Sequence, residues 1–262
     1  MTRLVDDQKL MYPSELFSVS EVTYRSGEYL VKGMLVIPDG SLRNGSAILY
    51  LRGGYRQVGM VRIPRMIQYA SLGFIVFGPY YRGNAGGEGV DEFGGADLED
   101  AYSGFDLLQE DRRVDPDRIH VVGFSRGGVM AAPTAVNRPV ASLTSWGAVS
   151  NCFRMYDERK DMGRLLRRTF QGPPDQARRT YQIRSPLNMA HQIQAPVQIV
   201  HATEDVHVPV LHALEWHRAL TVSGVPVTLR LIRNQGHRMT PKIQYEWTKQ
   251  VCQWMKKQEK GS

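Results

Sequence analysis

Polar and apolar positions alternate along the first part of the chain. The segments "FSVSEVTYRS" (17–26) and "EYLVKGMLVIP" (28–38) both follow this pattern, and the pair Ser26 and Gly27 lies at their junction. A period of two is typical of half-buried strands, and a glycine-containing turn between two such runs indicates an antiparallel hairpin. The sequence therefore predicts a hairpin near the start of the chain.

After this hairpin, continuous apolar runs replace the alternation. The runs at 46–54 and 74–83 close on glycines and are typical of strands buried on both faces. Further strands are predicted at 118–125, 140–150, 195–203 and 225–237. The segments between them show helical spacing. The clearest has Leu98, Ala101, Tyr102, Phe105 and Leu108 on one face.

Regular strand–helix alternation predicts an α/β fold, with a mostly parallel central sheet, helices on both faces and the N-terminal antiparallel hairpin. The Arg-rich segment of about 152–190 interrupts the alternation. We therefore expect one domain over 1–262, with 152–190 as a cap or lid over the C-terminal edge of the sheet. A surface helix with an apolar underside is an equally good interpretation of that segment.

Composition restricts the partners. The chain has 262 residues, 42% hydrophobic and 23% charged, as in ordinary globular proteins. Its formal net charge of +7 is scattered along the chain. The densest basic stretch, 164–179, lacks the interleaved aromatics and compact basic run of nucleic-acid binders, and a solvated helical face explains it better than a phosphate site. We expect no nucleic-acid partner.

The cysteines and the N-terminus bear on the compartment. Cys152 and Cys252 have no metal-like spacing and fit a reducing environment. The N-terminus has no apolar signal-peptide core, and no apolar stretch is long enough to span a bilayer. We expect a cytoplasmic protein with no membrane partner.

The stretch "GFSRGG" (123–128) places a serine between glycines where a strand passes into a helix. This is the context of a nucleophile elbow, and a serine nucleophile needs a base and an orienting acid. Downstream loops offer Glu204 and Asp205, then His237. The order serine, acid, histidine is that of α/β-hydrolases, and all three loops follow predicted strands. The predicted triad is Ser125, Asp205 and His237, with Glu204 as an alternative acid.

Acyl transfer also needs donors for a developing oxyanion. The backbone N–H of Arg126 is one candidate from the elbow geometry. The loop "RGGYR" (52–56) supplies Gly54 as the second donor, with Tyr55 as second choice. A simple tight turn is the alternative interpretation of that loop.

Four histidines, His201, His207, His212 and His217, cluster in the sequence. Their spacings do not place neighbours on one helical face, as an i, i+4 metal pair requires. We expect them to be ordinary surface or loop residues, and we expect neither a metal nor a cofactor.

Several blocks together resemble the catalytic domain of the prolyl oligopeptidase family, within the α/β-hydrolase superfamily. The resemblance covers about residues 20–255 and is carried by these blocks: "RGGY" (52–55), "GPYYRGNAGGEG" (78–89), the continuous 97–128, 185–209 and the "GH" at 236–237. It selects Asp205 over Glu204 as the acid and implies the catalytic histidine at His237. Two positions depart from the family pattern: Arg52 stands where the family usually has His or Tyr, and Ala202 replaces its glycine.

The resemblance also frames the expected activity. Only about twenty residues precede the hairpin, too few for the family's peptide-selecting β-propeller. We therefore expect a stand-alone serine hydrolase that cleaves small carboxylic esters through an acyl-enzyme. The alternative is a peptidase or amidase acting on short peptides or aminoacyl amides. A non-catalytic binding protein on a hydrolase scaffold is a third hypothesis, disfavoured by the intact trio.

Two further expectations concern the pocket and the assembly. In the segment 152–190, the side chains expected to line a substrate pocket are Phe153, Met155, Tyr156 and Phe170. Because several hydrolases of this class form dimers, the resemblance allows a homodimer.

Overall fold

The structure is a computed structural model, and it describes residues 3–259. Within these residues a mixed nine-stranded sheet has the order β1-β2-β3-β5-β4-β6-β7-β8-β9. The strands are β1 (Leu4–Leu10), β2 (Phe17–Ser26), β3 (Tyr29–Pro38), β4 (Ala47–Leu51), β5 (Ile75–Pro79), β6 (Ile119–Phe124), β7 (Ser142–Trp146), β8 (Val197–Ala202) and β9 (Val227–Ile232). The first three strands and the β3–β5 pair are antiparallel, and the remaining pairs are parallel.

Helices connect the parallel strands. They are α1 (Ile63–Ala70), α2 (Leu98–Gln109), α3 (Gly127–Asn137), α4 (Cys152–Glu158), α5 (Gly163–Thr169), α6 (Arg178–Ile183), α7 (Leu211–Val222) and α8 (Pro241–Lys256). Short 3₁₀ turns lie at η1 (Pro116–Arg118), η2 (Lys160–Met162) and η3 (Pro186–Gln192). The predicted α/β-hydrolase fold class is confirmed.

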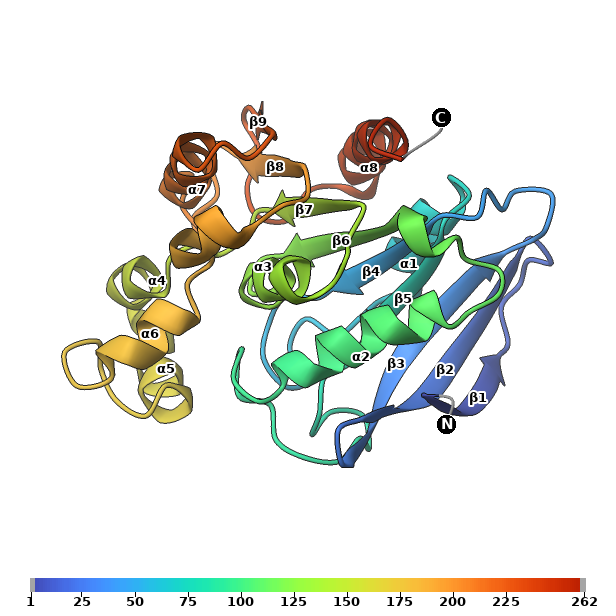
Figure 1. Ribbon diagram of the computed structural model, residues 1–262, viewed down its shortest axis with the longest axis horizontal. Coiled ribbons are helices and arrows are strands. Elements are labelled where there is room, and N and C mark those ends of the chain that lie inside the picture. The colour runs from blue at the N-terminus through green and yellow to red at the C-terminus, as the bar shows by residue number, and fades with distance from the viewer. Residues whose placement is uncertain (1–2, 260–262) are drawn as a thin grey trace.

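The sheet separates two hydrophobic cores. Along β4, Leu49 and Leu51 face one core, whereas Ile48 and Tyr50 face the other, as the period of two in a strand requires. Helices α2, α3 and α7 cover the first face, and α2 and α3 cross the near side of the sheet in Figure 1. Helices α1 and α8 cover the opposite face. Burial on both faces explains why β4 to β8 read as continuous apolar runs.

Two details differ from the sequence-based expectation. Strand β1 was not predicted, because six of its seven residues are exposed and its sequence "LVDDQKL" carries no alternating signal. It forms through antiparallel pairing with β2. In α8 the buried side chains are Thr248, Val251, Cys252 and Met255, whereas Trp247 and Trp254 are only half-buried. The spacing of Ile243, Trp247, Val251 and Trp254 predicts these four on the buried face of this helix, so the observed buried face is rotated from the predicted one.

The strand order has a topological switch point beside β4. β4 lies between β5 and β6, so the connection from β4 to β5 runs to one side of β4, and the chain then crosses to the other side to form β6. Ligands of open α/β sheets bind at such a switch point. Helices α4, α5 and α6, coloured yellow-green to gold, lie at the side of the molecule away from β1 to β3 (Figure 1).

Within residues 3–259 no helix combines the length and apolar character needed to cross a lipid bilayer.

Candidate active site

Ser125 occupies a sharp turn between β6 and α3. Its φ is +57°, a left-handed conformation that is costly for a side-chain-bearing residue. Gly127 in this turn and Gly53 in the loop after β4 allow the backbone segments around Ser125 to lie very close together. A Cβ on Gly127 would lie 2.0 Å from the Leu51 carbonyl oxygen, and one on Gly53 would lie 2.7 Å from the Ser125 Cβ. The turn therefore has the strained form expected of a nucleophile elbow.

Three distant segments meet at this turn. The Ser125 Oγ lies 3.0 Å from His237 Nε2, and His237 Nδ1 lies 2.7 Å from Asp205 Oδ2. The other oxygen of Asp205 accepts hydrogen bonds from the backbone N–H groups of His207 and Val208. The structure thus brings together the three predicted residues, and the competing Glu204 is exposed and outside this chain of hydrogen bonds.

The electrostatics define the histidine tautomer. Burial alone would raise the pKa of the Asp205 carboxyl, but its hydrogen bonds and the His237 ring hold that pKa below its usual value. An ionised carboxylate only accepts hydrogen bonds, so His237 Nδ1 carries a proton and donates it to Asp205. When the ring is neutral, Nε2 is then the acceptor for the Ser125 hydroxyl.

Two aromatic neighbours hold the His237 ring. Phe124 stacks on it with ring centroids 4.9 Å apart, and the His207 ring meets it edge-on at 5.3 Å. Sequence reasoning treated His207 as an ordinary loop residue; its place two residues after Asp205 was the available signal. The expectation that the clustered histidines are surface or loop residues is wrong for His201 and His212, which are buried. His201 Nε2 lies 2.7 Å from the Val208 carbonyl oxygen, and His212 Nδ1 accepts a hydrogen bond from the Ser150 N–H.

The loop after β4 runs directly against Ser125. Gly53 approaches the serine as described above, and Gly54 has a φ of +72°. A Cβ on Gly54 would lie 2.1 Å from the Val58 carbonyl oxygen, so only glycine fits this turn. The predicted donors Gly54, Tyr55 and Arg126 therefore lie on two segments that meet at Ser125.

The Arg126 side chain forms a buried charge cluster that sequence reasoning missed. Its guanidinium donates to both carboxylate oxygens of Asp91, at 2.6 and 2.9 Å, and to Asp97 at 2.7 Å. It also donates to the Gly54 carbonyl oxygen at 3.1 Å. Burial raises the pKa of Asp97 to about 6. An arginine directly after the predicted nucleophile was the available signal.

The segment 152–190 packs onto the site. Its hydrophobic cluster includes Tyr55 in the loop after β4, Val129 in α3 and Val208, three residues after Asp205. Of the four predicted pocket residues, Met155 and Phe170 are instead buried inside this cluster. Phe153 and Tyr156 are half-buried and retain surface.

Neither cysteine offers a second nucleophile. Cys152 and Cys252 are buried, and burial raises the pKa of each thiol to about 12. Among the residues described by the structure, no group of His, Cys, Asp and Glu side chains could hold a metal ion.

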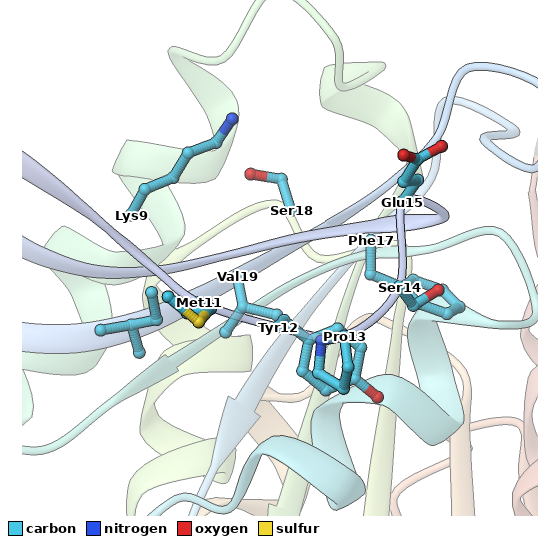
Figure 2. Close-up of a pocket in the computed structure, with 10 residues that line it drawn as sticks. Lys9, Met11, Tyr12, Pro13, Ser14, Glu15, Phe17, Ser18 and Val19 are labelled. Carbon is cyan, nitrogen blue, oxygen red and sulfur yellow. The ribbon is translucent and has the colours of Figure 1, made fainter.

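A cavity lies away from the triad. It has a volume of about 700 Å³ and opens at the β1–β2 connection, and Figure 2 shows the lining side chains, which come from residues 9–15 and 17–19. No triad residue lines it. The candidate active site is therefore defined by its hydrogen bonds and not by this cavity.

The fold and the hydrogen-bonded Ser–His–Asp arrangement define the chain as a serine hydrolase of the α/β type. The sequence model of the prolyl oligopeptidase family matches residues 62–262, and the chain belongs to this family.

Relatives agree with this assignment. The uncharacterized peptidase YtmA of Bacillus subtilis (strain 168) is 40% identical over 255 residues, which cover 97% of this chain and 99% of the relative. The acylaminoacyl peptidase of Pyrococcus horikoshii superposes with a TM-score of 0.79 at 21% identity, covering 95% of this chain and 43% of that chain. An acetyl xylan esterase from Paenibacillus sp. R4 has a TM-score of 0.75 at 20% identity, covering 96% and 87%. The two solved structures share the fold.

Proposed function

We propose that this chain cleaves short peptides or aminoacyl amides through an acyl-enzyme formed on Ser125, with small carboxylic esters as a second substrate class. The observation that carries the proposal is the continuous hydrogen-bonded path from the Ser125 Oγ through His237 to Asp205. A scaffold without catalysis has no chemical need for this path beside a strained serine.

In the proposed mechanism, Ser125 Oγ attacks the scissile carbonyl carbon while His237 Nε2 takes the hydroxyl proton. The N–H groups of Arg126 and Gly54 receive the negative charge that develops on the carbonyl oxygen. His237 returns the proton to the leaving amine or alcohol, and Asp205 keeps the ring in its tautomer and stabilises the imidazolium. Water then attacks the acyl carbon while His237 takes a proton from it. His237 returns this proton to the Ser125 Oγ, which leaves and frees the carboxylic acid.

Two observations weigh on the choice of substrate. The family and the relative at 40% identity favour amide bonds, because that relative is named a peptidase. The likeness to an acetyl xylan esterase over 87% of that chain keeps esters as the second candidate. The sequence alone led to small esters first. The alcohol of an ester is a better leaving group than the amine of an amide, so a triad that cleaves amides can also cleave esters.

The test is the variant Ser125→Ala, assayed beside the wild type on p-nitrophenyl esters and on aminoacyl and acyl-aminoacyl p-nitroanilides. We expect the substitution to lower kcat by at least about 10⁴-fold, because no other group can form the acyl-enzyme. The exposed Ser41→Ala serves as the matched control and should retain wild-type rates.

Labelling and substrate ranking separate the alternatives. A fluorophosphonate should label Ser125 in the wild type and leave Ser125→Ala unlabelled. A kcat/KM higher for anilides than for esters, after correction for the leaving group, supports the peptidase proposal, and the reverse supports the esterase. Wild-type activity in a folded Ser125→Ala variant would reject both.

A further inference from the structure

The side chain of Arg52, at the end of β4, is completely enclosed by protein. Its exposed fraction is 1%, and no carboxylate lies within ion-pair distance of it in the described part of the chain. Its five N–H donors are all used on backbone carbonyl oxygens. The acceptors are Gly53 (3.0 Å), Val58 (3.2 Å), Arg56 (3.0 Å) and Tyr80, the last at 2.8 and 3.3 Å from two guanidinium nitrogens.

These contacts join the loop of residues 53–58 to the end of β5. Three acceptors belong to that loop, and Tyr80 directly follows β5. The Tyr81 hydroxyl adds a hydrogen bond to the Arg52 carbonyl oxygen at 3.2 Å. A buried cation that donates three hydrogen bonds to one loop and two to the neighbouring strand end restricts that loop far more than a surface contact does.

One of these bonds bears directly on the proposed oxyanion site. The Gly53 carbonyl and the Gly54 N–H belong to the same peptide unit. Because a peptide is planar and trans, the direction of its C=O determines the direction of its N–H. The guanidinium of Arg52 holds the Gly53 oxygen on one side, so the Gly54 N–H must point to the other. A cation on the carbonyl also polarises the amide and strengthens the N–H as a donor.

Arg126 acts in the same way on the next peptide. Its guanidinium binds the Gly54 carbonyl oxygen at 3.1 Å, and that carbonyl shares a plane with the Tyr55 N–H. Gly54 itself has a positive φ and its neighbour Gly53 carries no side chain. Two consecutive peptides rich in glycine are free to rotate unless something holds their carbonyls.

We propose that Arg52 is a positioning residue for catalysis: its guanidinium sets and polarises the Gly53–Gly54 peptide so that the Gly54 N–H is aimed at the oxyanion before substrate binds. This inference rests on the proposed function. Arg52 acts through the backbone and does not itself contact the reacting atoms.

The side chain must be a guanidinium to do this. A lysine ammonium has three donors at a single point and cannot span carbonyls on both sides of the loop. A glutamine keeps two coplanar N–H donors but has no charge. We therefore expect Arg52→Lys and Arg52→Gln to leave the triad in place while the Gly54 peptide loses its fixed orientation.

The experiment compares both variants with the wild type on p-nitrophenyl butyrate. We expect kcat to fall about 10- to 100-fold while KM changes less than about threefold, because the oxyanion contact matters mainly in the transition state. Propyl trifluoromethyl ketone, which forms a hemiketal oxyanion on Ser125, should lose affinity by the same factor as kcat/KM. The pH profile of kcat/KM should keep its wild-type shape.

Arg65 provides the matched control. It is another buried arginine with no carboxylate partner among residues 3–259, and it binds Gln68, Thr248 and Tyr69 on the far side of the sheet. Arg65→Lys should lower the midpoint of thermal unfolding and leave kcat and ketone affinity unchanged. The contrast separates loss of stability from loss of oxyanion binding.

The outcomes are distinct. If folded Arg52→Lys or Arg52→Gln keeps wild-type kcat and ketone affinity, Arg52 does not position the donor. If ketone affinity stays while kcat falls, the loss arises outside the oxyanion contact and the inference is again wrong. If the wild type itself neither turns over the ester nor reacts with a fluorophosphonate, the proposed function fails first.

Discussion

At the scale of single residues, the site combines a strained backbone at Ser125 with a buried, hydrogen-bonded carboxylate at Asp205. Ser125 is held in a left-handed conformation, and the Ser125 N–H is anchored to the Trp146 carbonyl oxygen at 3.1 Å. Asp205 is buried, yet three donors satisfy its two oxygens. A buried carboxylate with this many donors remains ionised, which keeps His237 in the tautomer that accepts the serine proton.

The ionisation of Asp205 should affect both the rate of catalysis and the pH dependence of the free energy of unfolding. The pKa of Asp205 lies below the unfolded value of about 3.8, so the unfolded chain binds the proton more readily. The stabilisation from Asp205 is therefore fully present above about pH 5 and is lost as pH falls through the folded pKa. Asp205→Asn lacks this ionisation, so its unfolding free energy should fall less steeply than that of the wild type between pH 5 and 3.

The same variant should lower kcat about 10⁴-fold near neutral pH, because the amide favours the wrong histidine tautomer. Urea unfolding across the pH series and ester assays measure the two effects. Glu204→Gln, the exposed neighbouring acid, is the control and should match the wild type in both. Equal pH slopes for Asp205→Asn and the wild type would contradict the assigned stabilisation.

At the scale of elements, the site depends on how closely α3 packs on the sheet. The first residue of α3, Gly127, lies against the carbonyl oxygen of Leu51 at the end of β4. This contact brings Ser125 close to Gly53 and to the proposed oxyanion donor Gly54 in the loop after β4. The glycine is therefore required by packing between two elements, beyond its role in the turn.

Gly127→Ala tests this packing. A Cβ 2.0 Å from a backbone oxygen must displace either the helix or the strand, so we expect the free energy of unfolding to fall by about 1–3 kcal/mol or more. We also expect a larger loss of kcat than the stability change implies, because the displacement separates Ser125 from Gly54.

Gly163→Ala is the matched control, since Gly163 also begins a helix, α5, and a Cβ there meets nothing within 4 Å. It should leave stability unchanged or raise it by up to about 1 kcal/mol. Chemical denaturation measures the free energy of unfolding of both variants, and ester assays measure their kcat. Similar small effects at both positions would show that the close contact at Gly127 is unimportant.

At the scale of the whole molecule, four strand ends and one inserted segment assemble the site. Ser125 follows β6, Asp205 follows β8, His237 follows β9 and the loop that contains the proposed oxyanion donor Gly54 follows β4. The segment 152–190 packs on them through an aromatic cluster that reaches Tyr55. We propose that this segment is a cap that limits which substrates reach Ser125.

Tyr156→Ala tests the cap. Tyr156 is half-buried, stacks edge-on against Tyr181 at 5.8 Å and keeps part of its ring exposed. We expect the substitution to change the ranking of esters and peptides of graded size by about 3- to 10-fold in kcat/KM, since side-chain truncation in an apolar pocket has effects of about 1 kcal/mol or more. Tyr245→Ala on α8, also half-buried, should leave the ranking unchanged. An unchanged ranking in Tyr156→Ala would argue for a merely structural segment.

Much of this protein follows from local patterns in the chain. Buried parallel strands appear in the sequence as apolar runs, and the elbow appears as a serine between glycines directly after a strand. The aspartate and histidine loops follow predicted strands in the chain order serine, acid, histidine. These features depend on neighbours in sequence, so periodicity and turn chemistry carry them. The exposed β1 and the rotated face of α8 left no such signal, because pairing and packing with distant elements determine them.

The tertiary structure alone decided the contacts between remote residues. It buried His201 and His212, and it placed Met155 and Phe170, which were expected at a pocket wall, inside a hydrophobic cluster. It also directed the Arg52 guanidinium onto four carbonyl oxygens of the chain. A sequence states which donors and acceptors exist, but the partner of a long side chain depends on which backbone folds next to it.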